Sequence, residues 1–258
     1  MKTKFVPLSE AYFPSLDYYQ KAINYPYDAP TKPFSFVNGK CLEGVHLKTS
    51  DRFPILSVGS NRSPFQLRNK FSLNEDLCVM PAVLYDCDVV YSASISHYGS
   101  IPATQWPSKG TRVKLNVLWL NKKQLEIMHL TEGIGIAYNF VELKKNSVSI
   151  EGIDYSGPVY GYVSVNGIYD FHEGSPKRLK GLRSMNATLE GFSELQSLFF
   201  LKKKINIRNM NLKDWIKKII LDKFYRFRLI EKMQMNCVLP KNPPWEIVRV
   251  HAKGTNIY

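Results

Sequence analysis

The residues best suited to chemistry are Glu132 and a short turn, Gly59-Ser60-Asn61. The turn follows an apolar stretch at 53–58 and precedes Ser63-Pro64, a pair typical of a helix start. Backbone N–H groups exposed between a strand and a helix favour an anion or a developing oxyanion. A Gly-Ser-Asn sequence is more often ordinary turn chemistry, so the turn alone is a weak signal.

Glu132 is a carboxylate with apolar neighbours along the chain, Leu130, Ile134 and Ile136. A largely desolvated side chain is therefore expected. Desolvation raises the pKa of a carboxylate toward the range that suits general acid/base catalysis. The alternative, which stays open here, is a glutamate at a helix end that pairs with Lys or Arg at the surface.

A helix is expected to present Glu132. Asn121 is a typical cap for a helix over residues 122–130, and Gly133 can end such a helix in a left-handed conformation. Glu132 then sits where helix changes to loop.

Further strands and helices follow from the residue patterns. Strands are expected at 53–58, 79–94, 112–120, 138–143, 148–153 and 159–165, and helices at 65–71, 177–185, 189–203 and 212–233. Turn formers at 98–104 and 107–110 predict that the second and third strands pair in antiparallel fashion. Several short strands with few helices suggest a closed or nearly closed sheet.

Together these motifs resemble the γ-glutamylcyclotransferase-like family, whose hallmark is a strand ending in Tyr-Gly-Ser-Asn and a later Glu-Gly after a helix. Here Val58-Gly59-Ser60-Asn61 and Glu132-Gly133 stand in those places, with Val58 where the family usually has Tyr. The match extends to 99–104, 107–113 and 125–133, followed by Tyr138, and covers roughly residues 53–200.

The resemblance implies an α+β fold, a small mixed β-barrel of the γ-glutamylcyclotransferase-like type with flanking helices and a C-terminal helical extension. The chain is accordingly divided into three parts. Residues 1–50, rich in Tyr, Phe and Pro, are expected to form an irregular aromatic arm packed on the core, with a short helix possible at 16–22. Residues 51–200 would form the barrel domain, and residues 201–258 a basic helical extension.

The resemblance also implies one cavity bordered by Glu132 as the catalytic residue and by Val58, Gly59, Ser60, Asn61 and Tyr138 as substrate-binding residues. Glu132 would remove a proton from the α-amine of a γ-glutamyl group, the amine would attack its own γ-carbonyl, and the leaving amine would recover the proton. Backbone N–H groups near Gly59 would hold the substrate carboxylate or the oxyanion. Attack within one bound molecule gains from proximity, so no cofactor is expected.

Composition and cysteine spacing limit the classes of protein to which this chain could belong. A chain of 258 residues with 44% hydrophobic residues can bury a substantial core without disulfides or metals. Its start lacks the apolar run of a signal peptide, and no stretch approaches the roughly 18 apolar residues that span a bilayer, so a cytoplasmic protein is expected.

The widely spaced cysteines predict reduced thiols. No metal site is expected, because Cys78, Cys87, His97 and His129 lack the spacing of zinc ligands, and no Gly-x-Ser-x-Gly elbow presents a nucleophile.

The net charge of +13 is concentrated at residues 202–232, which hold eleven Lys or Arg against three acidic residues. Trp215, Ile216, Ile219 and Phe224 gather near one face of a helix there, and such a helix can lie on nucleic acid or an anionic membrane. Packing of that face on the domain is more frequent and is favoured. The alternative to an enzyme is a non-catalytic small-molecule binding module with this basic tail. The sequence does not indicate an oligomeric state.

Overall fold

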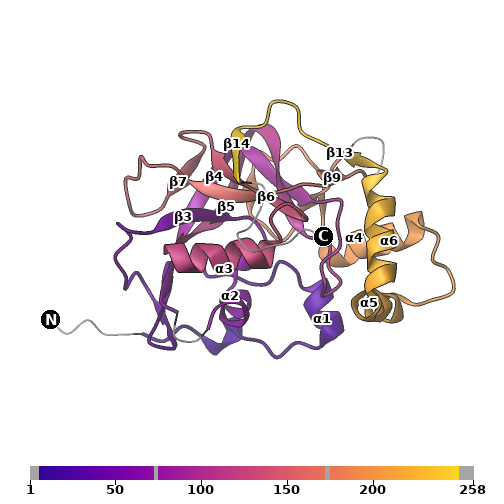
Figure 1. Ribbon diagram of the computed structural model, residues 1–258, viewed down its shortest axis with the longest axis horizontal. Helices are drawn as coiled ribbons and strands as arrows, with labels where there is room; N and C mark the ends of the chain where they lie inside the picture. The colour runs from indigo at the N-terminus through magenta and orange to yellow at the C-terminus, as the bar shows by residue number, and fades with distance from the viewer. Residues whose placement is uncertain (1–5, 73–74, 172–174, 250–258) are drawn as a thin grey trace.

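A computed structural model describes residues 6–72, 75–171 and 175–249. In these ranges the chain has the expected α+β fold, with helices against one large sheet (Figure 1). The main path of hydrogen-bonded strands has the order β12-β10-β4-β5-β3-β8-β6-β14. The bounds of these strands, in chain order, are β3 Phe53–Ser57, β4 Leu77–Tyr91, β5 Ala103–Leu120, β6 Tyr138–Leu143, β8 Tyr160–Ser164, β10 Arg178–Leu179, β12 Gly191–Phe192 and β14 Trp245–Arg249.

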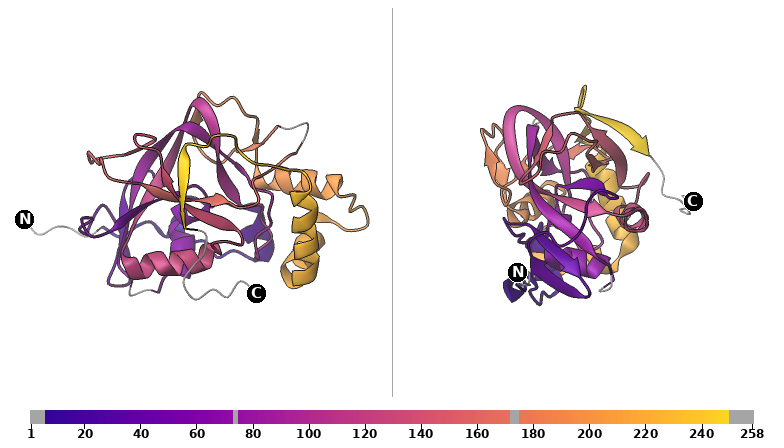
Figure 2. Two further views of the ribbon diagram at one scale, coloured as in Figure 1. Left: turned by 45° about the horizontal axis from the view of Figure 1, so that its top comes forward. Right: turned by 90° about the vertical axis from the view of Figure 1, so that its left-hand side faces the viewer.

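The centre of the sheet is the antiparallel pair β4 and β5, as predicted. β5 runs without a break through residues 107–110, so the turn expected there is wrong. The turn formers instead make a bulge: Asp86 and Gly110 have left-handed φ angles of 54° and 82°, and the Gly110 N–H donates to Asp86 Oδ1 at 2.7 Å. Bulges increase local twist, and the pair curves strongly along its length (Figure 2).

The sheet is mixed but not closed in the part that the structure describes. β3 pairs antiparallel with β5 and parallel with β8, and β6 then joins β8 to β14 through antiparallel pairs. The path ends at β12 and β14, which are not neighbours in it. The sheet is confirmed and the barrel stays a prediction. Short strands extend it: β7 Val148–Ile150 pairs with β4 and β11 Ser184–Met185 with β5, while β9 Ile168–Tyr169 pairs with β13 Cys237–Val238 in a second sheet.

The N-terminal arm is not irregular throughout, which corrects the expectation for residues 1–50. It contains the short 3-10 helix η1 Glu10–Tyr12, the helix α1 Tyr18–Ile23 close to the one considered possible at 16–22, and a hairpin of β1 Phe34–Val37 and β2 Lys40–Glu43. Asn38-Gly39 forms the hairpin turn with φ angles of 48° and 75°, the positive values that an Asn-Gly turn of this kind adopts. β1 pairs with β4, so the arm is joined to the main sheet.

The C-terminal helices are α4 Glu194–Lys204, α5 Leu212–Leu221 and α6 Lys223–Gln234, which gather at one end of the sheet (Figure 1). The helix expected at 177–185 is wrong, because β10 and β11 pair there with the long central strands. The helix expected at 212–233 is divided at Asp222, whose side chain accepts from the Tyr225 N–H at 2.8 Å and starts α6. Nor is the segment after residue 200 wholly helical, since β14 returns to the main sheet.

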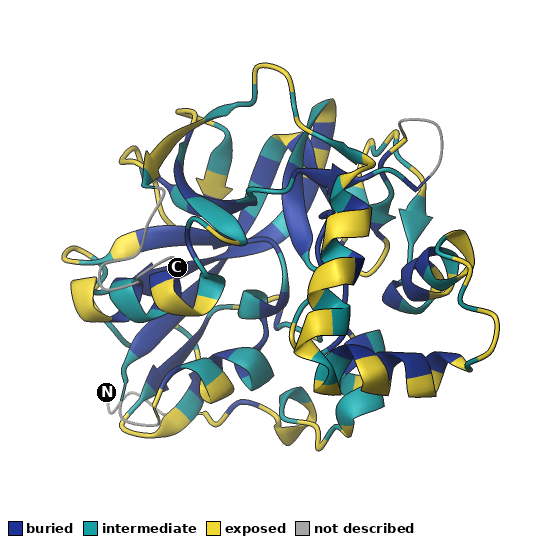
Figure 3. Ribbon diagram, turned by 45° about the vertical axis from the view of Figure 1, so that its right-hand side comes forward, coloured by how far each residue is buried: buried dark blue, intermediate teal, exposed yellow. Residues whose placement is uncertain are grey.

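The apolar face of α5 packs on the domain, as favoured from the sequence. Leu212, Trp215, Ile216 and Ile219 are buried in the same core as the sheet. Phe224 was expected on the same face, but this is wrong, because it lies on α6 beyond the break at Asp222 and is 76% exposed. Exposed residues lie on the outer side of α6 (Figure 3). Within the described ranges, no helix is both long enough and apolar enough to cross a membrane.

Candidate functional site

Glu132 lies in the last turn of α3 Lys122–Glu132. The helix begins at Asn121, whose side chain accepts from the Gln124 N–H at 2.9 Å in a capping box. It ends at Gly133, which has the left-handed angles φ 60° and ψ 56°. Both ends therefore follow the sequence signals, and the buried Met128 and His129 hold the helix on the sheet.

The Gly-Ser-Asn turn connects β3 to α2 Pro64–Lys70 through the short 3-10 helix η2 Ser60–Arg62. Arg62 anchors it, because its Nε donates to Asn116 Oδ1 on β5 at 2.9 Å. Gly59 is required by packing rather than by its φ of −125°. A methyl group on Gly59 would overlap the hydroxyl of Tyr25, which comes from the N-terminal arm.

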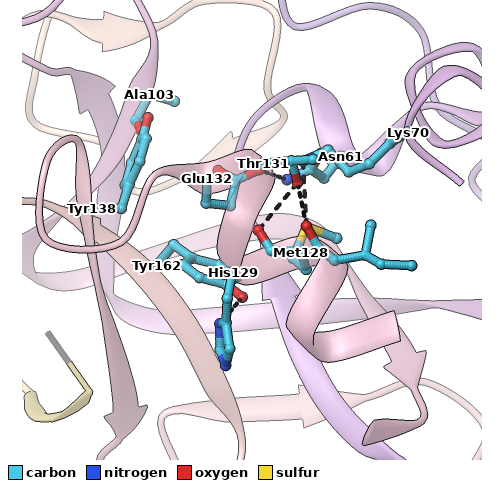
Figure 4. Close-up of polar contacts among 10 residues, drawn as sticks. Asn61, Lys70, Ala103, Met128, His129, Thr131, Glu132, Tyr138 and Tyr162 are labelled. Carbon is cyan, nitrogen blue, oxygen red and sulfur yellow. Dashed lines mark hydrogen bonds and ion pairs between the residues drawn. The ribbon is translucent and has the colours of Figure 1, made fainter. Parts of the chain in front are cut away.

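The two predicted centres meet. Asn61 Nδ2 donates to Glu132 Oε1 at 2.9 Å, and the Lys70 ammonium forms an ion pair with the same oxygen (Figure 4). The side chains of Lys70 and Glu132 are only 6% and 14% exposed. Lys70 Nζ also lies 3.3 Å from Met128 Sδ. Glu132 is thus largely buried, as one expectation had it, and it pairs with a lysine, as the alternative had it, but the pair lies in the cavity wall and not at the surface.

These residues border one cavity of about 770 Å³. All the predicted site residues line it: Val58, Gly59, Ser60, Asn61, Glu132 and Tyr138. Further lining residues that were not predicted to belong to this site are Tyr25, Tyr27, Lys70, His97, Tyr98 and Tyr162. Among the described lining residues, Glu132 is the one carboxylate.

Three tyrosines, the buried Tyr25 and the half-buried Tyr98 and Tyr138, form part of the wall. The Tyr138 hydroxyl donates to the carbonyl of Ala103 at 2.9 Å, and the Ala103 N–H donates to the Tyr25 hydroxyl at 2.8 Å. Burial raises the pKa of Tyr25 and of Tyr138 well above the ordinary value, and nearby Glu132 adds to this for Tyr138. Burial likewise raises the pKa of Tyr98 to about 12. These phenols stay neutral at physiological pH, which leaves proton uptake to other groups.

The four residues considered as zinc ligands do not come together. Cys78 and Cys87 are buried in the sheet, His97 lines the cavity, and the His129 ring contacts the Tyr162 hydroxyl at 2.8 Å. No group of three or more His, Cys, Asp or Glu among the described residues is arranged to hold a metal ion.

Neither a family model nor a curated protein matches the sequence. Several solved structures, in contrast, are similar to the structure of this chain. A protein from Arabidopsis thaliana, determined in solution, shares 17% identity over 69% of this chain and 96% of its own, with a TM-score of 0.37. An uncharacterized protein from Homo sapiens shares 18% identity over 66% and 100%, with a TM-score of 0.37. A gamma-glutamyl cyclotransferase shares 16% identity over 70% and 99%, also at 0.37. The solved structures similar to this chain thus include a member of the family that its sequence motifs resemble.

Proposed function

We propose that this protein cyclises a γ-glutamyl group to 5-oxoproline and releases an amine, with Glu132 as general base and then general acid. The observation that carries the proposal is the meeting of Glu132 with Asn61 in a cavity, since a largely buried carboxylate there faces the turn that the family motif specifies. A small-molecule γ-glutamyl substrate, a cytoplasmic location and independence from metals and cofactors belong to the same proposal.

The chemistry needs one proton carrier and one oxyanion site. Glu132 takes a proton from the substrate α-amine, whose nitrogen then bonds to the γ-carbonyl carbon. Glu132 returns the proton to the leaving nitrogen as the former amide bond breaks, so the carboxylate is regenerated. The first N–H groups of a helical turn have no partner within that turn, so those of Ser60 and Asn61 suit the developing oxyanion. Val58 and Tyr138 complete the wall.

Replacement of Glu132 tests the assignment. Glu132→Gln keeps the shape of the side chain and removes the base, and proton transfer by a side chain contributes about 10²- to 10⁴-fold. We expect release of 5-oxoproline from a panel of γ-glutamyl compounds to fall by at least that factor, with an unchanged circular dichroism spectrum. Glu126→Gln is the matched control, because Glu126 lies on the same helix and pairs with Arg249 outside the cavity. An inactive wild-type protein across the panel would contradict the enzyme assignment.

The rival function, a binding module with a basic tail, is favoured by the surface of α6. Phe224 is 76% exposed and Phe227 is 45% exposed, next to the exposed Lys223 and Arg228. Aromatic and basic side chains in this combination bind single-stranded nucleic acid by stacking and charge. This rival predicts salt-sensitive retention on single-stranded nucleic acid that Phe224→Ser with Phe227→Ser abolishes. Retention on anionic lipid vesicles instead would identify a membrane surface as the ligand.

A further inference from the structure

We propose that Tyr27, Phe65 and Tyr98 form an aromatic subsite for the leaving amine, and that the substrates are γ-glutamyl amides of aromatic amines without a positive charge. The inference rests on the proposed function and deepens it on the side of the leaving group. The three residues, called the ring cluster below, come from the N-terminal arm, from α2 and from the segment between β4 and β5.

The cavity has more room than a γ-glutamyl group fills. Its volume is about 770 Å³, and pockets of about 300–1,000 Å³ hold drug-sized ligands. With the reacting γ-carbonyl beside Glu132, the rest of the cavity is left for the group attached through the leaving nitrogen. A leaving amine without bulk, such as ammonia, would leave that part of the cavity unfilled.

The ring cluster lines this remaining space. Burial raises the pKa of Tyr98 and the charge of Glu132 adds to it, so Tyr98 adjoins the proposed reaction centre. The ring centroids of Tyr98 and Tyr27 lie 6.5 Å apart, and those of Tyr27 and Phe65 lie 5.1 Å apart with the rings edge-on. All three side chains are half-buried and line the cavity. Because aromatic rings favour a further ring in offset or edge-on contact, the cluster suits a flat apolar leaving group.

Tyr27 is held at the cavity by an unusual backbone conformation. Its φ angle of 63° lies in the left-handed region, which bulky residues rarely adopt. The Tyr27 N–H donates to the Asn24 carbonyl at 2.8 Å, and the Tyr27 hydroxyl donates to the Lys21 carbonyl at 3.0 Å. Unfavourable backbone conformations of this kind gather at ligand-binding sites. The arm therefore presents the Tyr27 ring as a preformed surface of the cavity.

The charges of the cavity exclude a cationic leaving group. Glu132 is the one carboxylate among the described lining residues, and it is paired with Lys70. Lys21 of α1 lines the cavity as well and forms no ion pair with a described residue. An ammonium on the leaving group would thus lose water without gaining a counter-charge, which is unfavourable. A neutral ring needs no counter-charge.

The test measures binding without turnover. The probe is 2-amino-5-(benzyloxy)pentanoic acid, which has a benzyl group in place of the leaving amine and no γ-carbonyl to attack. The comparison ligands are the butyl ether and the 4-aminobutyl ether of the same amino acid. We expect calorimetry with the wild-type protein to show about three- to tenfold tighter binding of the benzyl ether than of the butyl ether, as an aromatic contact gives. The 4-aminobutyl ether should bind at least about fivefold more weakly than the butyl ether.

Variants assign these preferences to residues. Tyr27→Leu should bind the benzyl and butyl ethers with equal affinity, while Tyr27→Phe, which keeps the ring, should keep the preference. Lys21→Met should narrow the difference between the butyl and 4-aminobutyl ethers. Phe53→Leu is the matched control, because Phe53 packs edge-on against Tyr160 outside the cavity, and it should leave both preferences unchanged.

The wild-type comparison of the ligands stands even if Tyr27→Leu does not fold. Equal or undetectable affinities for the benzyl and butyl ethers in the wild type, or a preference that survives in a folded Tyr27→Leu, would overturn the aromatic subsite. Equal binding of the butyl and 4-aminobutyl ethers would overturn the exclusion of cationic amines. A preference for the benzyl ether without release of 5-oxoproline from γ-glutamyl benzylamide would support the subsite while refuting the proposed reaction. Release of 5-oxoproline with no preference would do the reverse.

Discussion

Gly59→Ala tests how the N-terminal arm and the Gly59 turn depend on each other. The added methyl group overlaps the Tyr25 hydroxyl and lies 3.2 Å from its ring carbon Cζ, so the tyrosine must move. Movement breaks the 2.8 Å bond from the Ala103 N–H and leaves a buried donor unpaired, which costs about 1–3 kcal/mol. Overpacking adds about 1–3 kcal/mol. We expect the free energy of unfolding to fall by about 2–6 kcal/mol.

A double-mutant cycle in urea denaturation isolates the cause. Tyr25→Phe removes the overlapping oxygen, so Gly59→Ala should cost about 1–3 kcal/mol less in that background than in the wild type. Gly181→Ala is the control, because its methyl group meets only Pro26 Cδ at 3.6 Å, an ordinary contact, and a change within about 0.5 kcal/mol is expected. Equal costs of Gly59→Ala in both backgrounds would show that the Tyr25 hydroxyl is not what excludes a side chain at position 59.

Two buried groups should make stability depend on pH in opposite directions, with about 1.4 kcal/mol for each pKa unit. Burial lowers the pKa of His129 from 6.5 to about 4, so its contribution to stability is present above pH 6.5 and is lost as the pH falls toward 4. In His129→Asn the urea midpoint should therefore change less with pH between 6.5 and 4 than in the wild type. The same pH dependence in both proteins would contradict this. Burial raises the pKa of Glu194 well above its ordinary value, and one of its oxygens has no partner among the described residues. Its contribution to stability is therefore present at acid pH and is lost as the pH rises. The free energy of unfolding of Glu194→Gln, relative to that of the wild type, should therefore increase as the pH is raised from 5 to 8. No such gain would mean that the carboxyl is already ionised in the fold.

Local signals made α3 and the Gly59 turn predictable from the sequence. Asn121 and Gly133 act through residues within a few positions of themselves, so both ends of α3 follow from the chain alone. The start of α2 at Pro64 is of the same kind, although the Ser63 side chain makes no capping hydrogen bond. The hairpin at Asn38-Gly39 also carried such a signal, an Asn-Gly pair between two strands, but it lay in a region interpreted as irregular.

Other features depend on contacts between distant segments. Lys70 has no spacing relation to Glu132 that a sequence pattern could reveal, since the pair forms only when α2 and α3 pack together. Residues 178–179 and 184–185 have few strand signals of their own and are ordered by pairing with β4 and β5, so tertiary context overrides the helical pattern there. The burial expected for Glu132 is observed, and its pairing with a basic residue was an open alternative, but the sequence could not indicate that the partner is Lys70 or that the pair is buried.

The substitution at position 58 is best understood together with the arm. Val58 stands where the resembling family usually has tyrosine, and its side chain is buried in the main core. A tyrosine hydroxyl still contacts the turn, but it comes from Tyr25 and lies against Gly59. Tyr27 continues this wall and packs edge-on against Phe65 of α2, with ring centroids 5.1 Å apart. The arm therefore supplies one side of the cavity. Under the proposed function, a substrate held by Glu132 must fit residues from before position 50 as well as the sheet.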